Sequence, residues 1–514
     1  MNMKKCVLVL ACLVCIGSVA FAAGNKQGNS STDPVRISMY YPDNSTLPFR
    51  SDWLTVKKLE ELYNVKIDWE IIPMGDYAAK VSLALNTGNT PDVILYRSAT
   101  ESEDASLAKN GAIVPISDYS QWTPEWNARV KEFGAQAEVD RLRLDDGKLY
   151  FLPGLTDKPF YDGGLLMRED VINKYGFGVP KTYDDLYKLL KAYKADNPNS
   201  YPWTMYYGPR VQHRMLQPSW GLSVGRNGPS GRVLSWDYAK QEFFAGAISD
   251  QYREYLRYWH KLYAEGLLDP EMAEVIQDSV WYRKLSTGSA IGSVGWYDQI
   301  GGIEAASEIA GIKFNMYPPL EGPAGAYGEP KNRTGAGVLF PISVTKRPDF
   351  ERVVRAVDAM FFSTEAAKIW CLGVEGETYN MVNGKVQFIP AIANSPDGPY
   401  KYMQIAYGCG SAGTQFIWIN AQEMTKYDAN YSAINATVAS MNAIQARPPA
   451  PKYDSDVTSE RATSLMGVLW DALAVWDDAF ITGAKSIETD WNAYVAEMRQ
   501  KGIDEYLTLY NKYK

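Results

Sequence analysis

The sequence contains very few histidines and has no excess of positive charge. The 514-residue chain has only two histidines, His213 and His260, which cannot supply a three-histidine metal site. No other metal-ligand spacing stands out, so neither a metal nor another cofactor is expected. Acidic residues (60) outnumber Lys and Arg (52) and give a formal net charge of −8. Because binding to phosphate backbones needs a basic surface, nucleic acid is not expected as a partner.

The motifs of several enzyme classes are also missing. The glycine-rich stretches GPSG (228–231) and GSAIGSVG (288–295) lack the Lys-Ser/Thr of a phosphate-binding loop. A G-x-S-x-G nucleophile elbow does not occur. A glycoside hydrolase needs two carboxylates that face each other, and among 60 acidic residues a pair proves nothing. We therefore predict a protein that is not an enzyme, with a secreted polysaccharide-processing enzyme as the alternative.

The N-terminus carries an export signal. Residues 1–22 join a basic start, MNMKK, to an apolar run that closes in Ala20-Phe21-Ala22. This is the pattern of a signal peptide cleaved after Ala22, which is favoured over an uncleaved membrane anchor. Residues 23–34 are polar and rich in Gly, Ser and Asn, as in a flexible tether. The sequence thus predicts secretion across the cytoplasmic membrane, to the periplasm or cell envelope.

Three of the five cysteines, Cys6, Cys12 and Cys15, lie in this leader. The stretch VLAC (9–12) is similar to a lipobox, where a lipoprotein is cut and lipidated. It would leave an apolar run below the usual length of about 7–15 residues. A lipid anchor therefore stays open beside cleavage after Ala22.

The other two cysteines, Cys371 and Cys409, remain in the mature chain. An oxidising compartment permits a disulfide between them. They can equally stay as two buried thiols, and the sequence leaves both states open.

Length and periodicity predict an α/β fold with more than one core. A chain of 514 residues is too long for one ordinary core. Short apolar strands alternate with amphipathic helices, which is typical of a mostly parallel sheet. The first predicted elements are strands at Val35–Tyr41, Val65–Pro73 and Asp92–Tyr96, a helix capped by Ser51 or Asp52 with Trp53, Val56, Leu59 and Leu62 on one face, and a helix at Tyr77–Leu85.

The stretch LNTGNTPDVILY (85–96) shows how one such unit is built. Gly88 can end the helix with a positive φ, and Asn86–Pro91 then returns the chain to the sheet. Arg97 follows the end of the third strand. In open α/β sheets ligands bind at the carboxyl ends of the strands, so Arg97 is a predicted ligand-binding residue.

Further elements follow in the second half of the chain. Thr182 and Asp185 have the spacing of a capping box at the start of a helix. That helix is predicted to bury Leu186, Leu189, Leu190 and Tyr193, and a C-terminal helix to place Leu465, Val468, Leu469 and Ala472 on one face. Also predicted are a hairpin at Leu142–Pro153, strands at Tyr201–Tyr207 and Gly288–Gln299, and a helix at Gln251–Gly266.

Several segments, taken in order along the chain, resemble one protein family. They are LNTGNTPDVILY, AKNGAIVPISDY (108–119), DGKLYFLP (146–153), MREDVINKYGFGVPKTYDDL (167–186), LRYWHKLYAEGLLDPE (256–271) and GVEGETYNMVNGK (373–385). In this order they resemble the extracellular solute-binding proteins of ABC importers, in the large family 1 whose members mostly bind carbohydrates. The resemblance is to the long, lipoprotein-like branch and spans nearly the whole mature chain.

The resemblance implies a two-lobed periplasmic-binding-protein fold. Each lobe is expected to hold a mostly parallel sheet flanked by helices. The N-terminal lobe would comprise residues 35–155 plus 335–395, and the C-terminal lobe residues 156–334 plus 396–514.

The resemblance also implies a function. Hinge segments near Pro159–Gly164 and Thr334–Gly337 would let the lobes close on a ligand. The protein would act as a monomer that captures a carbohydrate, in particular an oligosaccharide, and delivers it to the transmembrane subunits of an ABC importer. A surface sensor or adhesin that reuses the fold is a further alternative.

Candidate ligand-binding residues are polar or aromatic side chains at strand ends or lobe crossings. Aromatic rings suit the flat C–H faces of sugars, and Asp, Asn and Arg suit their hydroxyl groups. Packing inside a lobe is the alternative role for each of them. The candidates are Tyr41, Asp43, Arg97, Tyr161, Tyr207, Arg210, Trp296, Asp298, Arg333 and Trp418.

Trp296 is the candidate with the most support. It follows Gly295 at the end of the small-residue stretch SAIGSV (289–294), where the ligand edge of a parallel sheet is expected. Related sugar-binding proteins in this family carry a tryptophan in a similar Gly-x-Trp or Gly-Trp setting as a stacking platform. The resemblance therefore implies a stacking role for Trp296, with lobe packing as the alternative.

Overall fold

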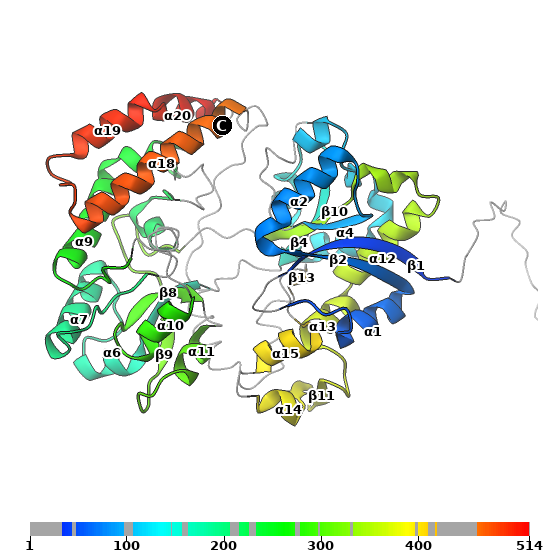
Figure 1. The fold of residues 1–514 in the computed structure, drawn as a ribbon, viewed down its shortest axis with the longest axis horizontal. Helices are drawn as coiled ribbons and strands as arrows, with labels where there is room; N and C mark the ends of the chain where they lie inside the picture. Colours follow the sequence, from blue (N-terminus) through cyan, green and yellow to red (C-terminus); the bar gives the residue numbers. More distant parts are fainter. Residues whose placement is uncertain are drawn as a thin grey trace, which may run out of the picture. The chain divides into compact units, whose positions relative to one another are not determined.

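Two larger sheets organise the described part of the chain (Figure 1). The computed structural model describes residues 33–43, 48–96, 106–144, 146–156, 163–205, 215–225, 233–272, 278–296, 299–328, 333–395, 399–409, 417–418 and 460–512.

The first sheet has six strands: β1 (Val35–Asp43), β2 (Val65–Pro73), β3 (Val93–Tyr96), β4 (Phe151–Thr156), β10 (Thr334–Leu339) and β13 (Ile417–Trp418). Their order is β13-β4-β10-β3-β1-β2. β1 pairs in parallel with β2, from Val35↔Val65 to Asp43↔Pro73, and with β3. β13 is parallel to β4, whereas β10 runs antiparallel to both β3 and β4.

Helices cover both faces of this sheet. Successive residues of a strand point to opposite sides, so each strand contributes side chains to a core cluster on either face. On β3, Val93 and Leu95 join one core cluster, whereas Ile94 packs with Tyr77 and Val81 on the other face. The first cluster draws on α1 (Leu54–Tyr63), α4 (Pro124–Phe133), α12 (Phe350–Phe362) and α13 (Thr364–Leu372), and the second on α2 (Met74–Thr87).

Most elements that the sequence predicts in this part of the chain are present in the structure. Helix α2 ends at Gly88, whose φ of 72° is the predicted left-handed cap. The predicted cap of α1 is wrong, because its N-cap is Trp53, without a side-chain hydrogen bond, rather than Ser51 or Asp52. Leu62, which the sequence predicts on the same face as Val56 and Leu59, is 47% exposed.

The second sheet has the order β8-β5-β9, with β5 (Gly163–Arg168), β8 (Gly292–Trp296) and β9 (Phe314–Tyr317). β5 runs antiparallel to both neighbours, so the predicted mostly parallel arrangement is wrong for these strands. A strand–helix alternation constrains the direction of consecutive strands only. β5 pairs with strands far along the chain, whose direction that alternation does not fix.

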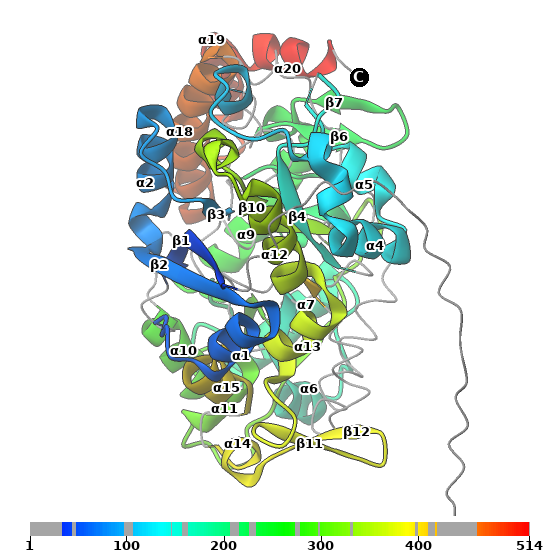
Figure 2. The same cartoon turned by 90° about the vertical axis from the view of Figure 1, so that its right-hand side faces the viewer.

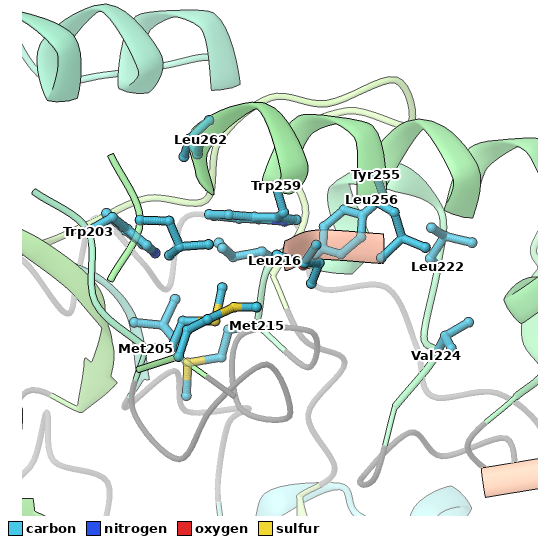
Figure 3. Packing of buried hydrophobic residues seen from close by; sticks show 14 of the residues in the cluster. Trp203, Met205, Met215, Leu216, Leu222, Val224, Tyr255, Leu256, Trp259 and Leu262 are labelled. Carbon is cyan, nitrogen blue, oxygen red and sulfur yellow. The ribbon is translucent and has the colours of Figure 1, made fainter. Parts of the chain in front are cut away.

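A second hydrophobic core, separate from the first, surrounds this sheet. It centres on α9 (Asp250–Ala264), where Tyr255, Leu256 and Trp259 are buried. The rings of Trp259 and Trp203 lie 6.3 Å apart (Figure 3). Trp203 forms only isolated parallel bridges, to Leu268 and Gly292, so the described residues of the predicted strand at 201–207 make no regular strand.

Helices surround this core and confirm several predictions. The capping box of Thr182 and Asp185 opens α7 (Tyr183–Asp196). In α18 (Glu460–Thr482), Leu465 and Leu469 are buried, but Val468 is 44% exposed, contrary to the prediction. The other helices and 3-10 turns here are α6 (Glu169–Tyr175), η2 (Gln217–Trp220), η3 (Gly246–Ile248), α10 (Asp278–Ser286), α11 (Ile300–Ala305), α19 (Trp491–Gln500) and α20 (Ile503–Asn511).

Smaller elements complete the described chain. The strands β11 (Tyr379–Val382) and β12 (Lys385–Phe388) form an antiparallel hairpin (Figure 2). A second short pair is β6 (Ser235–Asp237) with β7 (Glu242–Phe244). The remaining elements are η1 (Ile116–Trp122), α5 (Gln136–Asp140), η5 (Ile342–Lys346), α14 (Pro390–Ala393) and α15 (Pro399–Tyr407).

Candidate functional site

Three chain passages meet at one edge of the first sheet. β13, β4 and β10 are neighbours there, and Leu155 pairs with both Thr334 and Ile417. The backbone N–H of Thr156 donates to the carbonyl of Arg333, 2.8 Å away. The end of β4, the start of β10 and β13 therefore lie side by side.

Arg333 lies at this edge, but its guanidinium group forms hydrogen bonds with other residues of the protein. Nε and Nη2 each donate to the Glu138 carboxylate at 2.8 Å. Nη1 and Nη2 also donate to the carbonyls of Phe133 and Gly134, at 2.5 and 2.9 Å. These carbonyls end helix α4, where a positive charge is favourable. Arg333 thus anchors α4 to the start of β10, and its predicted role in ligand binding stays untested.

Tyr41 and Asp43 lie near the end of β1, next to an aromatic group. Tyr41 is only 2% exposed, and its ring is 4.4 Å from that of Phe49 and 5.9 Å from that of Trp69. The Asp43 carboxylate accepts a hydrogen bond of 2.8 Å from the backbone N–H of Phe49. Asp43 thereby holds Phe49 over the buried Tyr41.

Phe49 and Trp69 are half-buried and were not among the sequence candidates. Their rings lie 4.9 Å apart. Phe49 follows a polar stretch with no periodic pattern, so the sequence carried no signal for it. Trp69 pairs with Met39 in the parallel register of β1 and β2, two residues before Tyr41 along β1. That register was the available signal.

Trp296 is the last residue of β8, as predicted, and is half-buried. It is in register with Gly163 of β5. A Cβ atom at Gly163 would lie 3.3 Å from Nε1 of Trp296 and 2.6 Å from Cε of Met215. The lack of a side chain at Gly163 therefore leaves room for the indole beside β5.

Gln299 fixes the backbone that carries Trp296. Its Oε1 atom accepts a hydrogen bond of 2.9 Å from the backbone N–H of Trp296, and the side chain is buried. A Cβ atom at Gly295 would lie only 2.8 Å from the same Oε1. The structure thus explains why glycine precedes Trp296, because a side chain at residue 295 would keep Gln299 from reaching the end of the strand.

Replacing Gln299 by methionine should lower the free energy of unfolding by about 1–3 kcal/mol, because the N–H of Trp296 loses its acceptor in a buried place. Urea unfolding measures the change. The matched control is Gln251→Met, at an exposed position of α9, where little change is expected. Equal effects of the two substitutions would contradict a positioning role for Gln299.

An ion-pair network holds Trp203 and Thr204 in place. Lys284 Nζ lies 2.5 Å from Oδ2 of Asp269 and 2.6 Å from the Glu271 carboxylate. The Thr204 hydroxyl donates to the same Oδ2 at 2.8 Å, and the backbone N–H of Asp269 donates to the Trp203 carbonyl. Asp269 belongs to the stretch LLDPE (267–271), and its role here is to hold Trp203 and Thr204.

Several predicted site residues lie outside the described part of the chain, namely Arg97, Tyr161, Tyr207, Arg210 and Asp298. For Trp418 the structure describes the backbone alone, which pairs with Thr156. Of the described candidates, Tyr41 and Asp43 lie together on the first sheet, Arg333 lies at α4, and Trp296 lies on the second sheet.

Within the described ranges, no group of three or more His, Cys, Asp or Glu is arranged to hold a metal ion. Among the same residues, no helix has both the length and the apolar character needed to span a membrane.

Comparison with known families identifies the class of protein to which this fold belongs. Residues 55–367, more than half of the chain, match the model of the bacterial extracellular solute-binding proteins. The chain belongs to this family. The family predicted from the ordered segments is thereby confirmed, as is the two-lobed fold.

Individual relatives match along the whole chain. The lipoprotein LipO of Bacillus subtilis is 23% identical, with 100% of this chain and 96% of that protein aligned. The fructooligosaccharide ABC transporter substrate-binding protein FusA of Streptococcus pneumoniae is 22% identical, covering 99% of this chain and 97% of FusA. Among solved structures, the alginate-binding protein AlgQ2 superimposes with a TM-score of 0.74 at 18% identity, covering 94% and 98% of the two chains.

Proposed function

We propose that this protein is the substrate-binding subunit of an ABC importer and captures a carbohydrate, in particular an oligosaccharide, between its two lobes. The match to FusA over nearly the full length of both chains carries this proposal. The protein would then be exported, hold no catalytic activity, act as a monomer and hand its ligand to transmembrane importer subunits.

The lobe boundaries form part of the proposal. Residues 35–155 and 335–395 belong to the N-terminal lobe, and 156–334 to the C-terminal lobe. We extend the N-terminal lobe to Trp418, because Trp53 Nε1 donates to the Ile405 carbonyl and β13 pairs with β4.

The three neighbouring passages at β4, β10 and β13 are the proposed hinge. Each leads into or out of a stretch that joins the two cores, and adjacent strands can bend together while the cores stay rigid. The hydrogen bonds of Arg333 to Glu138 and to the end of α4 then attach this hinge to the N-terminal lobe.

In the proposed site, Trp296 stacks on a sugar ring from the C-terminal lobe, and Phe49 with Trp69 offers an aromatic surface on the N-terminal lobe. Flat C–H faces of sugars suit such rings. Asp43 serves by fixing Phe49.

Replacing Trp296 by alanine should weaken ligand binding by about 2 kcal/mol or more, roughly 30-fold, while the melting temperature changes little. Calorimetric titration and thermal unfolding measure both quantities. The matched control is Trp122→Ala, because Trp122 is half-buried and stacked on Tyr119 of the first lobe, 4.7 Å away. This control should keep its affinity. A strongly destabilised Trp296 variant, or one with native affinity, contradicts the stacking role.

The function itself is tested with a panel of mono- and oligosaccharides. Ligands that bind the folded state raise the melting temperature, and titration then gives the affinity. Chromatography of the sugars after long incubation separates a carrier from an enzyme. Saturable binding with intact sugar supports the proposal, whereas cleaved products, or no binding to any sugar of the panel, contradict it.

A further inference from the structure

The two cysteines of the mature chain lie against the same helix end. Cys371 is in the last turn of α13, and Cys409 follows α15. Both are free thiols in the structure, and both side chains are buried, at 5% and 2% exposure. The Cys409 Sγ lies 3.9 Å from the carbonyl oxygen of Ile369, two residues before Cys371. The segment that carries Cys409 is thus packed on the helix that carries Cys371.

Three contacts fix this segment in place. Trp53 Nε1 donates to the Ile405 carbonyl at 2.9 Å, and Thr55 Oγ1 donates to the Tyr407 carbonyl at 2.7 Å. Gly408 has a φ of 77°, and a Cβ atom there would lie 2.5 Å from Cε3 of Trp53. A side chain at Gly408 would push the segment away. The chain therefore arrives at Cys409 along a defined path, with little freedom to leave α13.

The electrostatic environment agrees with two neighbouring sulfur atoms. Burial, and in second place the charge of the Cys371 thiolate, raises the pKa of the Cys409 thiol well above its usual value. A buried thiol with a raised pKa forms little thiolate at neutral pH, so it exchanges slowly with reagents in solution. A bond between these sulfur atoms would thus form during folding and be protected afterwards.

We propose that Cys371 and Cys409 are joined by a disulfide in the exported protein. Each thiol loses its proton, the S–S bond forms, and two electrons pass to the oxidant. The oxidant is a disulfide-donating thiol oxidase of the cell envelope, whose own disulfide is reduced to two thiols. In the test tube glutathione disulfide takes this part and yields two glutathione thiols. The cell-envelope oxidant depends on the export proposed above, whereas the pairing itself depends on the contacts within the fold.

The link would close the chain around the hairpin β11–β12 and helix α14. It would hold the end of α15 on α13 just before the chain reaches β13 at the edge of the first sheet. A closed loop has fewer unfolded conformations, which stabilises the folded state. The expected role is to secure this side of the first sheet, where we place the hinge.

Peptide mapping tests the pairing directly. The purified full chain is denatured, reduced, and refolded with a mixture of oxidised and reduced glutathione. It is then quenched with acid, alkylated in denaturant and digested with trypsin. The peptides 369–385 and 402–426 should appear as one linked species that separates on reduction. Recovery of both peptides in alkylated form overturns the proposal. This outcome does not depend on sugar binding, so it is distinct from failure of the proposed function.

Thermal unfolding provides the second test. The oxidised protein should melt about 4 °C or more above the reduced protein. Cys371→Ala, Cys409→Ala and the double variant should share one melting temperature, insensitive to reductant, because either change removes the whole link. Two separate thiols would instead give single effects that add, and no response of the native chain to reductant. That pattern overturns the proposal.

Discussion

Replacing Lys284 by methionine should lower the free energy of unfolding by about 3 kcal/mol or more. The side chain of Asp269 is 5% exposed and that of Lys284 16%, so the ion pair between them is largely shielded from water. Removing Lys284 leaves the Asp269 carboxylate buried without its counter-charge, which destabilises the folded protein. The Thr204 hydroxyl and one backbone N–H would remain as its hydrogen-bond donors.

The control for this prediction is Lys188→Met. Lys188 pairs with Asp184 at 2.6 Å, but the two side chains are 55% and 66% exposed. Surface pairs of this kind contribute less than about 1 kcal/mol. Adding Asp269→Asn to Lys284→Met should restore part of the loss, because the unpaired charge is gone. Urea unfolding of the native chain and these three variants tests the prediction, and a Lys284 variant no less stable than the Lys188 control would refute it.

The second large effect concerns Asp358 of α12 and its dependence on pH. The Asp358 carboxylate is buried and accepts hydrogen bonds from the backbone N–H groups of Glu125 and Trp126, at 2.8 and 2.9 Å. It thus caps the start of α4, whose other end is held by Arg333. Burial is the main cause that raises the pKa of Asp358 to about 7, against 3.8 for the ordinary group.

The sign follows from proton binding. Between about pH 4 and pH 7 the folded protein holds a proton on Asp358 that the unfolded chain has lost, so stability falls as the pH rises. The contribution is complete below the unfolded pKa and is lost as the pH passes the folded pKa. A shift of this size corresponds to a loss of up to about 4 kcal/mol.

Asp358→Asn removes this titration and keeps one acceptor oxygen. Measured against the native chain, the variant should gain stability from about pH 4 to pH 7 and show a constant difference above. Below about pH 4 it should be the less stable protein, because one backbone N–H has lost its acceptor. Glu125 and Arg355, which also act on Asp358, are present in both proteins. A difference that does not vary with pH would show that Asp358 has an ordinary pKa.

Elements whose causes are local could be predicted from the sequence. The strands and helices between Val35 and Tyr96, the left-handed cap at Gly88 and the capping box at Thr182 depend on residues a few positions apart. The sequence also placed Trp296 at a strand end, since Gly295 and the apolar run before it are neighbours in the chain. Ordered family segments gave the two-lobed class.

Features that depend on residues far apart in the chain could not be predicted in this way. Arg333 is engaged by Glu138, 195 positions earlier, and no pattern near Arg333 indicates that contact. Tyr41 is buried because Phe49 and Trp69 fold over it. The amphipathic pattern of α18 did not show that Val468 would face solvent, because the edge of an apolar stripe is set by the neighbours that pack on it. Strand direction in the second sheet likewise follows from pairing between remote segments, and such pairing is a property of the whole fold.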